Sequence, residues 1–173
     1  MSSLLSRSVE LEITNRTQSI TLKNPRTFFE CGSWFRPPLP ELHPGSSDTS
    51  RFTNSLPFWG EAGILVYEAD SFTLAIYFSN PIDYNKFSME LGLELSLSKA
   101  HRGRLAEIYA RMAKGIYPSS FQDAKFDRVT VDESHRTTQL SDGPIKVTAT
   151  MHKDRTSILR VELEELCCAE RGS

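Results

Sequence analysis

Residues 78–85 read FSNPIDYN, and Lys86 and Phe87 follow them directly. The apolar residues just before this segment alternate, which is typical of a strand with one buried face. The Ser-Asn-Pro sequence then ends the strand, because proline cannot donate a hydrogen bond to a neighbouring strand. Tyr84 and Phe87 place two aromatic rings beyond the turn. Aromatic faces beside a hydroxyl and a proline edge can bind a quaternary ammonium ion, although a β-turn with packed aromatic residues is the simpler interpretation.

Apolar residues alternate with a period of two along most of the chain, and this predicts a mainly β protein. We expect Asn24 and Pro25 to break the second strand, and residues 37–47 to form a loop because prolines and a glycine interrupt them. Many short strands separated by turns favour a sandwich or a barrel. The predicted strands cover residues 9–13, 20–22, 26–35, 62–67, 72–78, 89–95, 129–131, 145–151 and 159–163.

A helical period predicts one principal helix over residues 98–114, packed on a sheet. Ser98 is the candidate N-cap and Gly115 the residue that ends the helix. Gly103 costs about 1 kcal/mol inside a helix and favours a later start. The apolar stripe that faces the sheet consists of Leu105, Ile108, Tyr109 and Met112.

Length and composition fit one domain, which we place at residues 9–166 between tails at 1–8 and 167–173. The chain has 173 residues, of which 39% are apolar and 24% charged. A net charge of −2 argues against nucleic acid as a partner. The sequence shows neither a signal-peptide core nor an apolar run that could span a membrane. We therefore expect a cytoplasmic or peripheral membrane protein, and the odd number of three cysteines fits a reducing compartment.

The sequence offers no pattern that predicts catalysis. It contains no nucleophile elbow, no phosphate-binding glycine loop and no defensible pair of carboxylates. The histidines lack metal-ligand spacing, so each is expected on the surface and we predict no cofactor or metal; they are His43, His101, His135 and His152. We expect a binding protein rather than an enzyme.

The segment FSNPIDYN, with an aromatic residue two positions later, resembles the signature of the actinoporin family, the β-sandwich cytolysins of sea anemones. NPRTFFECG, residues 24–32, is similar to the vertebrate actinoporin-like proteins, and the resemblance runs from Val9 to Glu165. It implies a sandwich flanked by helices, with an N-terminal amphipathic helix that perforates membranes. About eight residues precede the first predicted strand, and a helix of that length spans roughly 12 Å of a hydrocarbon core about 30 Å thick. The resemblance therefore implies lipid binding, with the pore helix missing from this chain.

The resemblance also implies a site for phosphocholine head groups. Ser79, Pro81, Phe87 and Tyr109 match the family's serine, proline and two of its tyrosines, and Tyr84 adds a ring on the same loop. The Glu30-Cys31 pair stands where an arginine and a serine often occur, and Glu30 would repel a phosphate. Leu105 and Ala110 replace two further tyrosines. The predicted head-group residues are Ser79, Pro81, Tyr84, Phe87, Tyr109 and Cys31.

Lipid-facing tryptophans of the family are replaced here by Lys86 and Glu90. The candidates for contact with a membrane are Trp34, Phe35 and Lys86, and also Phe58 and Trp59 if their rings are exposed.

Three functions remain open. The first is a module that binds phosphocholine lipids of the sphingomyelin type, or a membrane surface, with self-association on the membrane. The second is an intracellular β-sandwich that binds proteins or carbohydrates and keeps the fold without lipid binding. The third is a pore-former that uses another element in place of the missing helix.

Overall fold

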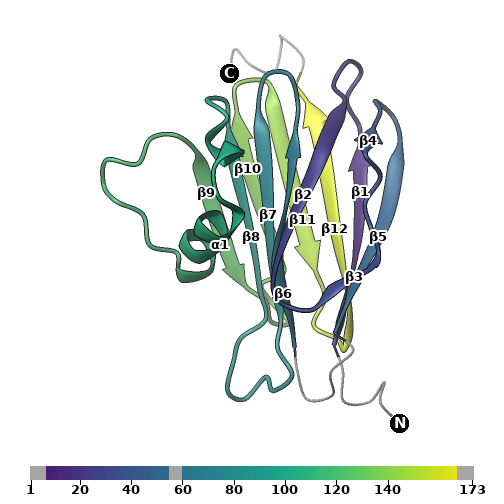
Figure 1. The fold of residues 1–173 in the computed structure, drawn as a ribbon, viewed down its shortest axis with the longest axis vertical. Helices are drawn as coiled ribbons and strands as arrows, with labels where there is room; N and C mark the ends of the chain where they lie inside the picture. Colours follow the sequence, from purple (N-terminus) through teal and green to yellow (C-terminus); the bar gives the residue numbers. More distant parts are fainter. Residues whose placement is uncertain (1–6, 55–59, 167–173) are drawn as a thin grey trace.

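The computed structural model describes residues 7–54 and 60–166, which form two β-sheets and one α-helix (Figure 1). The element bounds are β1 Ser8–Asn15, β2 Leu22–Cys31, β3 Ser33–Arg36, β4 Glu41–Leu42, β5 Ser47–Thr53, β6 Glu61–Glu68, β7 Thr73–Asn80, β8 Glu90–Ser96, a short 3-10 turn at Ala100–Arg102, α1 Leu105–Lys114, β9 Lys125–Thr130, β10 Thr137–Asp142, β11 Ile145–Met151 and β12 Thr156–Glu165.

The two sheets pack face to face as a sandwich. The first has the strand order β10-β11-β12-β1-β5-β3 and the second the order β4-β2-β6-β7-β8-β9. Strands β1 and β12 pair in parallel, whereas the other pairs are antiparallel. Figure 1 shows α1 on the outer face of the second sheet, away from the first. The predicted sandwich with one helix packed on a sheet is confirmed.

The core explains why the alternating segments become strands. Side chains on the inner faces of both sheets, such as Leu11, Ile76 and Val161, are almost fully buried in one cluster. On the outer face of the second sheet, a smaller cluster joins Ile64 and Tyr77 to the apolar stripe of α1. Strands β6 and β7 are therefore buried on both faces, which is why their sequences are almost continuously apolar.

The prediction that Asn24 and Pro25 end a strand is wrong. Strand β2 runs through both residues, and its pairing with β6 shifts register between Lys23 and Arg26. Asn24 takes a left-handed conformation with φ of 52° at this bulge. A bulge leaves a residue without a ladder partner, so a proline can be tolerated there.

Three strands were missed. The shortest, β4 at Glu41–Leu42, lies inside the stretch predicted as a loop and pairs with β2 through only two residues. The other two were missed because their outer residues are polar. Strand β5, Ser47–Thr53, begins inside the stretch predicted as a loop, and β10 is Thr137–Asp142. In β5 only Ser50 and Phe52 are buried, so apolar residues show almost no period of two along this strand.

The principal helix is confirmed, but its predicted start at Ser98 is wrong. Lys99 has φ of 60° and Gly103 is extended, so the segment forms a 3-10 turn before α1 begins at Leu105. Gly115 ends the helix as predicted, with φ of 65° and its N–H bonded to the carbonyl of Arg111. Among the described residues, no helix is both long enough and apolar enough to cross a bilayer.

A buried ionic network fastens α1 to the second sheet. Glu94 of β8 is 0% exposed and accepts hydrogen bonds from Nε2 of His101 at 2.8 Å, from Arg111 and from Tyr117. His101 is also fully buried, with Nδ1 2.8 Å from Oγ1 of Thr73, so its predicted surface location is wrong. Burial alone would raise the pKa of Glu94, but these hydrogen bonds outweigh it and lower the pKa to about 2.

Candidate functional site

A pocket of about 540 Å³ lies at one end of the second sheet, on the face that carries α1. Its floor is a row of paired residues. Cys31 pairs with Ala62, Ala62 with Ser79, and Ser79 with Glu90. Paired residues on antiparallel strands point to the same face, so these four side chains stand side by side across β2, β6, β7 and β8.

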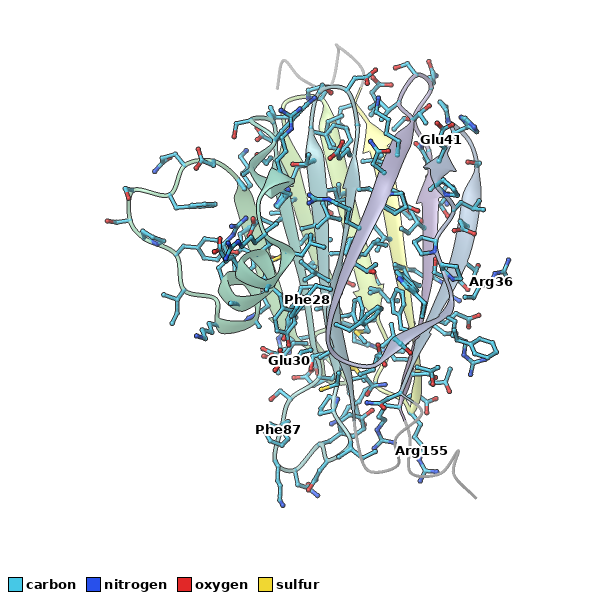
Figure 2. The ribbon with its side chains drawn as sticks, viewed as in Figure 1. Phe28, Glu30, Arg36, Glu41, Phe87 and Arg155 are labelled. Carbon is cyan, nitrogen blue, oxygen red and sulfur yellow. The ribbon has the colours of Figure 1, made fainter. Side chains whose placement is uncertain are left out.

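The loop that follows β7 forms the rim of the pocket. Pro81 starts this loop, and the N–H groups of Lys86 and Phe87 both donate to the carbonyl of Asp83, at 3.2 and 3.0 Å. Arg7 holds the loop from the other side by donating to the carbonyls of Pro81 and Ile82. Figure 2 shows Phe87 on this loop and Glu30 close to the same end of the sandwich.

The pocket brings together five of the six predicted head-group residues. Phe87 is 64% exposed, so no packing requirement explains its ring. Tyr109 reaches the pocket from α1, and its ring also packs against Phe28 at 5.3 Å and Tyr77 at 5.7 Å. Burial raises the pKa of Tyr109 to about 12. The five that line the pocket are Cys31, Ser79, Pro81, Phe87 and Tyr109.

Tyr84 does not join the residues that line this pocket. Its hydroxyl lies 2.7 Å from Oδ1 of Asn80 and 2.9 Å from the carbonyl of Asp154, its two acceptors. Cationic groups of Arg7 and Lys153 each lie 4.8 Å from the ring centre. Tyr84 therefore ties the rim loop to the turn between β11 and β12.

The candidates for membrane contact occupy different environments. Trp34 is half-buried, packs 4.1 Å from the ring of Phe52 and donates from Nε1 to Thr27, so it anchors β3 internally. Phe35 is 71% exposed, away from the pocket lining, with the guanidinium of Arg51 near its ring. Lys86 is exposed next to Phe87 on the rim loop. Phe58 and Trp59 lie outside the described residues, as do Cys167 and Cys168.

Sequence reasoning noted Glu30 and Glu90 but missed that they line one pocket together with Glu61. The pocket lining includes Glu30, Glu61 and Glu90, with no lysine, arginine or histidine among the described lining residues. Glu90 is partly neutralised, because Tyr77 donates to it at 3.1 Å and Arg128 lies 3.4 Å away. Within the described part of the chain, no group of three or more potential ligand side chains is arranged to hold a metal ion.

Glu61 is the most unusual of these carboxyl groups. It is 1% exposed, and neither carboxyl oxygen has a hydrogen-bond partner in the described structure. Burial raises its pKa to about 9, so the carboxyl group is protonated at neutral pH. One signal of this buried carboxyl group is visible in the sequence, a glutamate that opens the apolar strand EAGILVYE.

Comparisons with known proteins support the fold. No protein-family model and no curated protein sequence matches the chain. Among solved structures, the chain is similar to the crystal structure of the lipid binding protein Nakanori, with a TM-score of 0.66. The two are 13% identical, and the match covers 92% of this chain and 71% of that one. At this identity the likeness shows a shared β-sandwich fold alone.

Proposed function

We propose that this protein is a peripheral lipid-binding module whose pocket takes up the cationic end of a zwitterionic phospholipid head group, phosphocholine among them. It acts by binding rather than by catalysis. The observation that carries the proposal is the convergence in one pocket of an exposed Phe87, a partly buried Tyr109 and two carboxyl groups, those of Glu30 and Glu90. Ring faces and carboxyl groups both attract a cation, and burial strengthens each interaction.

The geometry also suits contact with a membrane surface. Phe87 and Lys86 are adjacent and exposed on the rim loop. An aromatic ring is favoured at the level of the lipid head groups, and a lysine can reach a phosphate oxygen there. The described lining residues include no lysine, arginine or histidine, so the phosphate would remain at the mouth while the cationic group enters. The fold that this chain shares with a protein named as lipid binding also supports the proposed lipid-binding function.

Phe87→Ala is expected to weaken binding to vesicles of sphingomyelin and phosphatidylcholine by about 5- to 30-fold, or about 1–2 kcal/mol, because the cation loses one ring face. Co-sedimentation measures the binding, and dye release from the same vesicles reports perforation as a separate result. Phe35→Ala is the matched control, since it removes an equally exposed ring outside the pocket. An equal loss in both variants would indicate general aromatic contact with the bilayer and would count against the pocket.

The acidic lining favours a second candidate, a β-sandwich that binds carbohydrate. Glu30 is exposed at the pocket and repels phosphate, while carboxyl groups beside aromatic rings can bind sugar hydroxyls and ring faces. Binding to a glycan array without binding to any vesicle would favour this function over the first.

A further inference from the structure

A group of basic side chains lies at the same end of the sandwich as the pocket but outside the pocket lining. Figure 2 shows Arg155, in the turn between β11 and β12, at the same end as Phe87 of the rim loop. The other members come from the rim loop, from the same turn and from the residue that precedes β1. We call this group the basic cluster, and it consists of Arg7, Lys86, Lys153 and Arg155.

Tyr84 holds the segments of the basic cluster together. Cationic groups of Arg7 and Lys153 each lie 4.8 Å from the centre of its ring, a distance at which cation–π attraction is effective. Its hydroxyl donates to the turn between β11 and β12, and Asn80 donates to the carbonyl of Arg155 in that turn at 3.2 Å. The turn is therefore fixed against the rim loop, and its basic residues stay beside that loop.

The positive charge of the cluster is not neutralised by ion pairs. Among residues 7–54 and 60–166, none of its four side chains forms an ion pair with a carboxylate. Arg7 is 9% exposed and donates to backbone carbonyls instead. The carboxylates of the two loops, Asp83 and Asp154, accept from backbone N–H groups of their own turns at 2.9 and 2.6 Å. Unpaired positive charges that lie together attract an anionic partner.

The surroundings of the cluster favour a membrane surface as that partner. Lys86 of the cluster is next to Phe87, whose ring is 64% exposed, and Lys153 and Arg155 are also exposed. Aromatic rings are favoured at the level of the lipid head groups, and basic side chains are attracted to anionic lipids there. The whole chain has a net charge of −2, so attraction to an anionic surface must come from a local cluster.

We propose that the basic cluster is a second membrane contact, which binds the negatively charged surface of anionic phospholipids while the pocket takes up the cationic end of a zwitterionic head group. This inference rests on the proposed function, because it requires this end of the sandwich to meet a bilayer. A basic residue close to an anionic bilayer strengthens binding by roughly fivefold. Asp83 and Asp154 oppose part of this attraction, so we expect anionic lipid to strengthen binding by about tenfold.

The test compares vesicles of phosphatidylcholine alone with vesicles of phosphatidylcholine and phosphatidylglycerol in equal amounts. Phosphatidylglycerol carries a negative charge and no amine, so a gain in affinity reports the negative charge rather than a second cationic head group. By co-sedimentation at low salt, the wild-type protein should bind the mixed vesicles about tenfold more tightly. The gain should shrink as salt is added, because ions screen the attraction between exposed charges.

A pair of double variants assigns the gain to the cluster. Lys153→Gln with Arg155→Gln should reduce the gain to less than about twofold and leave binding to phosphatidylcholine vesicles nearly unchanged. The matched control is Arg102→Gln with Arg104→Gln, which removes the same charge from two exposed arginines between β8 and α1. The control should keep the gain, and circular dichroism checks that both variants are folded.

Each outcome decides between the claims. Equal binding of the wild-type protein to both vesicles, a gain that persists at high salt, or a gain that survives in the Lys153 and Arg155 variant would overturn the inference and leave the proposed function standing. An equal loss of the gain in both double variants would also overturn it, because the attraction would then depend on the charge of the whole protein. Binding to the mixed vesicles alone would support the basic cluster and overturn the function proposed for the pocket. Absence of binding to every vesicle would overturn both.

Discussion

Replacing Glu94 by glutamine is expected to lower the free energy of unfolding by about 3 kcal/mol, because it leaves buried donors without a charged partner. Removing one member of a buried ion pair usually costs about 3–5 kcal/mol. The side chain of Arg111 is 23% exposed and can recover some hydration, which favours the lower end of that range. His101 is fully buried and loses its carboxylate with no access to water.

Urea unfolding followed by circular dichroism measures this loss. Glu107→Gln is the matched control, since Glu107 is an exposed glutamate on α1 and its replacement should change stability by less than about 0.5 kcal/mol. If Glu94→Gln also changed the free energy of unfolding by less than about 0.5 kcal/mol, the network would contribute little to attaching α1. The pocket would also be affected in a destabilised variant, because α1 carries Tyr109.

The same network predicts a loss of stability in acid. The pKa of Glu94 falls from its usual 4.5 in the unfolded chain to about 2 in the folded protein. The folded state therefore binds fewer protons between these values, so the contribution is complete above pH 4.5 and disappears as pH falls towards 2. At 1.36 kcal/mol per unit, the loss is about 3 kcal/mol, and Glu94→Gln should not show it.

The sandwich could be predicted from the sequence because its central strands are strongly patterned. Strands β7 and β8 bury Leu74, Ile76 and Leu93 on one inner face, and their alternation is visible without a structure. Polar β5 could not be found this way, since its place is fixed by pairing with β1 rather than by its own residues. The bulge at Asn24 likewise depends on how β6 pairs on either side of it.

The candidate site and its surroundings likewise include some residues that could be found from the sequence and others that could not. The family resemblance led to five residues of the pocket, because the segments that carry it, around Cys31 and from Ser79 to Phe87, can be read directly in the sequence. The burial of Glu61 is not local, since it requires the close approach of Gly32 from the β2–β3 connection. Nor could the pattern LGLELS show that Glu94 meets His101 and Arg111, because alternating polar residues on a strand usually face water.

Replacing Glu61 by glutamine is expected to stabilise the protein by about 2–4 kcal/mol at pH 7.5, which is opposite in sign to the effect at Glu94. The pKa of Glu61 rises from its usual 4.5 to about 9 on folding. Between these values the folded state keeps a proton that the unfolded chain has released, so the stability of the wild-type protein falls as pH rises. Glutamine carries no charge in either state and removes this dependence.

Thermal and urea unfolding at pH 5, 7 and 8.5 measures the difference between the two proteins. The difference in the free energy of unfolding between the two proteins should be small at pH 5 and should widen as pH rises. Burial and the nearby Glu30 and Glu61 also raise the pKa of Cys31 from its usual 9.0. The Cys31 thiol therefore affects the pH dependence of stability only above this range. A glutamine variant that is less stable than wild type at every pH would mean that Glu61 has a stabilising partner. A gap that widens as expected would show that the fold tolerates a destabilising buried carboxyl group at the start of β6.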